Sequence, residues 1–138
     1  MTMTFDTKIA VAVRDDLPVW QRVNMTVFLV SGIAASGEGM VGEEYEDASG
    51  NRYLPMFRQP VLVYEAPAAK LRVLYERAMR REVRFALFID ELFGTGNDVD
   101  NRAAMRAVAA EELKIAGLAL RAERKIVDKI FDGVRFHP

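Results

Sequence analysis

Cysteine is absent from the 138 residues, and histidine occurs only once, at His137. The lack of cysteine excludes disulfides, thiolate nucleophiles and cysteine-rich zinc sites. A lone histidine beside the last residue cannot form a histidine-based metal cluster, and a fraying end is a poor place for a catalytic base. We therefore expect no metal site and no cofactor.

The chain also lacks an excess of charge of either sign and any long apolar run. Nineteen basic residues face 20 acidic ones, so the formal net charge is −1. No global basic field exists to attract RNA or an acidic membrane, and RNA contact would have to be local. No apolar run approaches the roughly 18 residues of a transmembrane helix, and the first residues lack a signal-peptide pattern. We expect a cytoplasmic protein with no membrane partner.

What the chain does contain is typical of one globular domain over residues 1–138, with 51% hydrophobic and 28% charged residues. Two short apolar runs end in acidic residues: residues 8–14 precede Asp15 and Asp16, and residues 84–89 precede Asp90. Continuous hydrophobicity is typical of strands that are buried on both faces. Such sheets usually carry their sites at the carboxyl edge.

The remaining pattern predicts alternating helices and strands. Residues 61–89 form a strand, helix and strand, which we expect to be a right-handed parallel unit. A hairpin or flap is expected around 38–58, with its turn at residues 49–51. The helix over 17–35 is apolar almost all round, so we expect it to be buried or to form a subunit interface. The predicted strands are 8–14, 61–64, 84–89 and 113–120, and the predicted helices are 17–35, 67–81, 101–110 and 123–131.

Three segments, residues 9–17, 85–90 and 122–130, resemble type II, archaeal-type peptidyl-tRNA hydrolases. They resemble more closely an uncharacterised bacterial family of unknown function grouped with those hydrolases. That family shares the Asp-Leu-Pro opening at Asp16, the asparagine at Asn24 and the Lys-x-Val-Asp motif that begins at Lys125. The resemblance implies a three-layer α/β fold with a four-stranded, mixed and mostly parallel sheet flanked by helices, often as a homodimer.

The hydrolases also allow a residue-by-residue comparison. Their functional aspartate at the end of the third strand matches Asp90, and a threonine in the following loop matches Thr95. Their functional lysine has no counterpart, because no lysine lies between Lys8 and Lys70. The nearest cation is Arg22, which stays protonated and cannot replace an adjustable lysine. The activity implied by the resemblance is therefore left unassigned.

Asp90 is the first candidate from the residues themselves, since a carboxylate at the exit of a buried strand can orient a water or accept a proton. Its alternative role is to cap the loop before Gly94. Asp15 and Asp16 invite a two-carboxylate site, although an acid before Leu-Pro is more often a helix cap. If the two strands are neighbours, Asp16 and Asp90 would lie within reach of one ligand.

Other candidates are uncharged polar residues. Asn24 and Ser31 form a polar line on the apolar helix, which indicates either a ligand pocket or hydrogen bonds to a neighbouring loop. The loop 94–97, which includes Asn97, could hold an anion but lacks the pattern of a P-loop. The basic residues of 67–84, Arg84 among them, fit either phosphate recognition or a solvated face. Four large side chains are interpreted as a pocket under the flap or as core and dimer contacts: Trp20, Tyr53, Met56 and Phe57.

We therefore expect a hydrolase-like domain of unassigned activity, with Asp90 and Thr95 as catalytic residues. The alternative is a non-catalytic module that binds a small molecule or peptide in the cleft under residues 43–58. A homodimer through the first helix is expected in either case. The residues expected to contact the ligand are Asp16, Asn24, Ser31 and Asn97.

Overall fold

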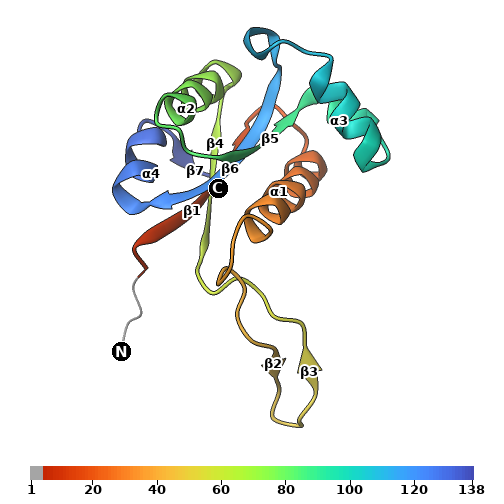
Figure 1. Cartoon of the computed structure of the whole chain (residues 1–138), viewed down its shortest axis with the longest axis vertical. Coiled ribbons are helices and arrows are strands. Elements are labelled where there is room, and N and C mark those ends of the chain that lie inside the picture. Colours follow the sequence, from red (N-terminus) through yellow and green to blue (C-terminus); the bar gives the residue numbers. More distant parts are fainter. Residues whose placement is uncertain (1–4) are drawn as a thin grey trace.

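A five-stranded mixed sheet runs through the centre of the computed structural model, which describes residues 5–138 (Figure 1). The strand order is β5-β6-β1-β4-β7. These strands are β1 (Thr7–Arg14), β4 (Val61–Ala66), β5 (Phe85–Ile89), β6 (Ile115–Glu123) and β7 (Arg135–Phe136). The helices are α1 (Val19–Ala34), α2 (Ala68–Arg80), α3 (Asp98–Arg106), α4 (Arg124–Ile130) and the short 3-10 helices η1 (Asp90–Gly94) and η2 (Ala110–Glu112).

The strand pairing is mainly antiparallel. β1 is parallel to β4, whereas β6 is antiparallel to both β1 and β5, and β7 is antiparallel to β4. The predicted mixed α/β class is confirmed, but the predictions of four strands and of mostly parallel pairing are wrong. β7 has two exposed residues and so carries no hydrophobic pattern that would announce a strand.

The segment 61–89 forms the predicted strand, helix and strand, but its two strands are not neighbours. β4 and β5 point in the same direction because each relates to β1 through the pairings above, yet β1 and β6 lie between them. The long β6 enters the sheet beside β1 and displaces β5 to the edge. The adjacent parallel pair is instead β1 and β4, connected through α1.

Both faces of the sheet are covered, which explains the continuous hydrophobicity of β1. Its residues Ile9 to Val13 have no exposed surface. Ala10 and Ala12 pack with α2 and α4 on one face, whereas the side chains that alternate with them pack against α1 on the other. The layers therefore run from α1 through the sheet to α2 and α4, as Figure 1 shows.

Helix α1 is not buried all round. Only Met25, Leu29 and Ile33 are buried, because they face the sheet. The opposite side, here called the α1 outer face, is apolar and open to solvent, with exposures from 52% for Phe28 to 69% for Val19. Its members are Val19, Trp20, Val23, Val27 and Phe28. Of the two expectations for this helix, complete burial is wrong.

The predicted hairpin is present and extends away from the rest of the molecule (Figure 1). β2 (Tyr45–Glu46) pairs with β3 (Arg52–Tyr53). Asp47 accepts a hydrogen bond from the Tyr53 hydroxyl at 2.7 Å and others from Asn51 and the Ser49 amide. The Tyr53 and Asn51 hydrogen bonds lower the pKa of Asp47 to about 2. This carboxylate therefore organises the turn predicted at residues 49–51.

Gly117 of β6 marks a close approach of α1 to the sheet. A Cβ atom at this position would lie 2.8 Å from the Met25 sulfur and 2.9 Å from the Ala12 carbonyl oxygen. The carbonyl belongs to the central strand and cannot move aside. We predict that Gly117→Ala lowers the free energy of unfolding by about 1–3 kcal/mol, as overpacked core substitutions do. Urea denaturation of the purified variant measures this change.

Gly96→Ala is the matched control for that substitution. A Cβ atom at Gly96 would meet no atom within 4 Å. Its stability should stay within about 0.5 kcal/mol of the parent protein, as for other surface changes. Equal stabilities for the two variants would contradict the close approach at Gly117.

Candidate functional site

Three segments meet around Arg14 at the carboxyl edge of the sheet. Arg14 ends β1, and its Nη1 donates to Asp90 Oδ1 at 2.7 Å, while its Nε donates to Asp16 Oδ1 at 2.6 Å. Nη1 also donates to the Ile115 carbonyl at 3.1 Å. The structure thus brings Asp16 and Asp90 to one guanidinium, although β6 lies between their strands. We call these three side chains the Arg14 triad.

An irregularity in the sheet positions Asp90. The β5–β6 register shifts between Phe88 and Ile89, so that Phe88 pairs with Gly117 but Ile89 pairs with Ile115. Such a bulge bends the strand end and redirects the next side chain. The Asp90 amide then donates to the Lys114 carbonyl at 3.1 Å, and η1 begins. The carboxylate is consequently fixed toward Arg14.

The three side chains of the Arg14 triad differ in their exposure to solvent. The side chains of Arg14, Asp90 and Asp16 are 12%, 36% and 65% exposed. Burial lowers the pKa of Arg14, but the hydrogen bonds to Asp90 and Asp16 outweigh it, so the net direction is upward. The guanidinium therefore stays charged. Among residues 5–138, the hydrogen bonds that Asp16 and Asp90 accept through their carboxylates involve only the Oδ1 atom of each.

The Arg14 triad faces a cavity of about 450 Å³, which we call the edge cavity. Arg72 of α2 forms part of its wall and donates to the carbonyls of Ala110, Glu111 and Leu113 at 3.0–3.2 Å. Arg72 thereby fixes the segment before β6. The lining residues are Arg14, Asp16, Ala68, Ala69, Arg72, Asp90, Leu113, Lys114 and Ile115.

A second charged cluster lies on the α1 side of the same sheet edge. Glu65 is only 4% exposed and pairs with Arg22 at 3.4 Å and with Arg135. Arg22 also contacts His137 Nε2 at 3.2 Å. The His137 amide donates to the Val63 carbonyl at 2.9 Å. The expectation of a fraying position for His137 is therefore wrong, because β7 holds it against β4.

Asn24 and Ser31 lie on the exposed side of α1, away from the Arg14 triad. The Ser31 hydroxyl donates to the Phe28 carbonyl of its own helix. The expected polar line on a buried face is therefore wrong, because this side of α1 is open. Asp15 and Asp16 do not cap α1 either: its N-cap is Pro18, without a side-chain hydrogen bond. Asp16 lies two residues before this N-cap, and its carboxylate accepts a hydrogen bond from Arg14 instead.

The other two predicted residues serve the loop before α3. The Thr95 hydroxyl hydrogen-bonds with Asn101 and with the Leu92 carbonyl. Asn97 is the N-cap of α3 and accepts from the Asp100 amide at 2.9 Å. Asn97 therefore stabilises a helix end, and none of the hydrogen bonds of Thr95 reaches the Arg14 triad.

Of the four candidates for a pocket under the hairpin, Met56 and Phe57 line a cavity there, whereas Trp20 and Tyr53 do not. Trp20, Tyr53 and Met56 are exposed, whereas Phe57 packs against the core on the α1 side. This cavity has a volume of about 260 Å³, and only segments 42–45 and 56–58 of the hairpin line it. Trp20 of α1 does not contribute to it.

Sequence reasoning missed Arg14 and Glu65, and it considered Arg72 only as one of the basic residues of 67–84. Arg14 carried a usable signal, since it is a cation at the end of an apolar strand and directly precedes two acids. Glu65 likewise ends an apolar run. The pairing of Arg14 with Asp90 spans 76 residues, however, and no local pattern reports such a contact. Within residues 5–138 no group of three or more acidic or histidine side chains could hold a metal ion.

The fold and this site define a mixed α/β domain with a charged cavity at the carboxyl edge of its sheet. The chain belongs to the family described as "Protein of unknown function (DUF2000)", whose profile matches residues 7–138. The chain is also similar to a solved protein of unknown function from Agrobacterium tumefaciens strain C58. The match covers 98% of this chain and 100% of the other, with 45% sequence identity and a TM-score of 0.95.

These comparisons confirm the predicted membership of an uncharacterised family. No curated protein matches the chain. Neither match names peptidyl-tRNA hydrolase. No helix in the described part of the chain combines the length and the apolar character needed to span a membrane.

We predict that Arg14→Gln lowers the free energy of unfolding by about 1–2 kcal/mol, because two adjacent carboxylates lose their shared counter-ion; the partial exposure of both acids limits the loss. Arg14→Lys keeps the charge but cannot form both hydrogen bonds of the guanidinium fork, so it should lose less. Urea denaturation at pH 7 measures both changes. An Arg14→Gln protein as stable as the parent would show that the Arg14 triad does not hold this edge together.

Proposed function

We propose that this chain is a binding domain for a small molecule carrying an amino group, which occupies the edge cavity. One observation carries the proposal: Asp16 and Asp90 each commit Oδ1 to Arg14, and within residues 5–138 the second oxygen of each accepts no hydrogen bond. Both residues line the edge cavity. Two carboxylate oxygens are thus available as acceptors for a donor-rich ligand.

The charges of the Arg14 triad favour an ammonium group among possible donors. One guanidinium balances one of the two carboxylates, so the triad keeps a net negative charge that a single ammonium would neutralise. Lys114 lines the same cavity and is exposed, so it can meet an anionic group of the same ligand. A ligand with both groups, such as a free amino acid, matches this distribution best.

Hydrolysis, the activity implied by the resemblance to peptidyl-tRNA hydrolase, is the competing proposal. Its two candidate catalytic groups are engaged with different partners: Asp90 with Arg14, and Thr95 with Asn101 and Leu92. Catalysis requires an acid or base and a positioning group that converge on one reacting atom. The hydrogen bonds of Asp90 and Thr95 favour binding over this chemistry.

The test is a titration of the isotope-labelled full chain with a panel of free amino acids, followed by amide shifts in NMR spectra. We predict saturable shifts at Asp90, Lys114 and Ile115. Asp90→Asn should weaken binding about tenfold, as expected for the loss of one charge-assisted hydrogen bond. Ethylamine and acetate, each with only one of the two charged groups, should bind more weakly.

Glu76→Gln is the matched control, because Glu76 is an exposed acid on α2 that does not line the edge cavity. Its affinities should equal those of the parent. Binding that is unchanged in Asp90→Asn, or no binding by any amino acid, would contradict the proposal. Release of peptide from peptidyl-tRNA by the purified protein, lost in Asp90→Asn, would replace binding by hydrolysis.

We also propose that a second copy of the chain packs on the α1 outer face. This face carries five large apolar side chains that are more than half exposed. A groove of about 370 Å³, partly lined by Val23, Val27 and Val63, lies beside it. Projecting rings and a groove on one surface can complement each other across a two-fold axis, as an isologous dimer requires.

Val27→Glu tests this dimer, since it places a charge in the middle of the α1 outer face. The parent should have twice the chain mass by light scattering at tens of micromolar, and Val27→Glu should be monomeric. Val99→Glu is the control: Val99 is 72% exposed on α3 and is not one of the residues of the α1 outer face, so this variant should leave the dimer intact. A monomeric parent protein would contradict the proposal.

A further inference from the structure

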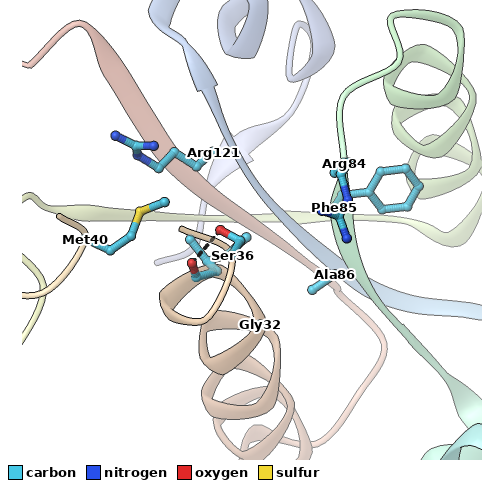
Figure 2. Close-up of a pocket in the computed structure, with 8 residues that line it drawn as sticks. Gly32, Ser36, Met40, Arg84, Phe85, Ala86 and Arg121 are labelled. Carbon is cyan, nitrogen blue, oxygen red and sulfur yellow. Dashed lines mark hydrogen bonds between the residues drawn. The ribbon is translucent and has the colours of Figure 1, made fainter. Parts of the chain in front are cut away.

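A second cavity, of about 350 Å³, lies at the opposite end of β5 from Asp90 (Figure 2). It opens beyond the end of α1, which stops at Ala34 and leaves the start of β5 uncovered. We call it the arginine cavity because two guanidiniums line it. Its residues are Gly32, Ile33, Ser36, Met40, Arg84, Phe85, Ala86 and Arg121.

The sheet register places the two arginines at the same end of the β5–β6 pair. Phe85 pairs with Leu120 in the antiparallel ladder, and Arg84 and Arg121 are the next residues beyond that pair on the two chain segments. Alternate residues of a strand project from the same face of a sheet. For Arg84 and Arg121 this is the α1 face, since Ala86 and Ala119, which lie two residues away from them along the chain, pack in the same cluster as the buried residues of α1. Figure 2 shows Arg121 and Arg84 on two sides of the cavity, with Ser36 between them.

This arrangement is unfavourable in the absence of a ligand. Two positive charges that line one cavity repel each other. Among residues 5–138, neither Arg84 nor Arg121 takes part in an ion pair. The Nε of Arg121 is moreover buried without a hydrogen-bond partner, the one such side-chain atom in the described part of the chain. A buried donor of this kind calls for an acceptor.

We propose that the arginine cavity binds a small organic phosphate. Two guanidiniums balance the two negative charges of a phosphate monoester, and their planar N–H groups match its oxygens. The buried Nε of Arg121 would gain its acceptor from the same group. The walls formed by Ile33, Met40 and Ala86 offer apolar surface to the organic part, and the volume suits a small ligand.

The proposal is independent of the edge cavity, because the two cavities share no lining residue. It also gives Arg84 a role that the sequence left open. Arg84 lies beyond the end of α2 and directly before β5, so it belongs to this cavity and not to the basic face of that helix.

Phenyl phosphate is the probe, titrated calorimetrically into the full chain in 100 mM sodium chloride. We expect saturable binding, with at least tenfold weaker binding of benzoate, which carries one negative charge. Arg121→Gln and Arg84→Gln should each raise the dissociation constant at least tenfold. Arg80→Gln, which removes an exposed arginine of α2 outside the cavity, should leave it unchanged.

Two outcomes separate a ligand role from a structural one. Arg121→Gln removes a charge that has no partner, so without ligand it should melt at the same temperature as the parent or higher. If Arg121→Gln does not fold, the exposed Arg84→Gln decides the question. The proposal is overturned if phenyl phosphate does not bind the parent, if both variants bind it as the parent does, or if benzoate binds equally well.

Discussion

The complete burial of β1 is the constraint on which the rest of the structure depends. Five consecutive residues of this strand have no contact with solvent, so both faces of the sheet must be covered and both of its sides paired. α1 covers one face, α2 and α4 cover the other, and β4 and β6 form the hydrogen-bonded ladders on the two sides of β1. Arg14 is the first charged residue after this stretch. The position of the charged site therefore follows from where the core ends.

The two ends of β5 differ in their electrostatics. At its carboxyl end, Asp90 shares Arg14 with Asp16, and across the sheet Glu65 is held between Arg22 and Arg135. At its amino end, Arg84 and Arg121 line one cavity, and among residues 5–138 neither forms an ion pair. Mixed charges that satisfy each other stabilise a fold, whereas charges of one sign at close range must be balanced from outside. The sheet thus separates two chemically different surfaces.

Local patterns predicted the bounds of several elements well and the pairing of the strands poorly. The predicted bounds of β1, β5 and α2 agree with the structure to within one residue at each end, because runs or helical spacings of apolar residues mark these elements locally. The strand order was harder to predict than the strands themselves, since the position of β6 between β1 and β5 depends on contacts between segments that are distant in the sequence. For the site, the strand ends correctly located Asp16 and Asp90 at one edge. The expected burial of Asn24 and Ser31 was wrong, because apolar composition does not distinguish a buried helix face from an exposed one.

The two-residue strand β7 affects how the edge of the sheet can associate with other chains. β4 would be an open edge without β7, with main-chain groups free to pair with a strand of another chain. β7 covers it with only two residues, and Phe136 stacks on Tyr64 at 4.6 Å. Arg135 then brings a charge, and Pro138 offers no amide for a further ladder. The sheet therefore ends in a segment that is poorly suited to templating aggregation.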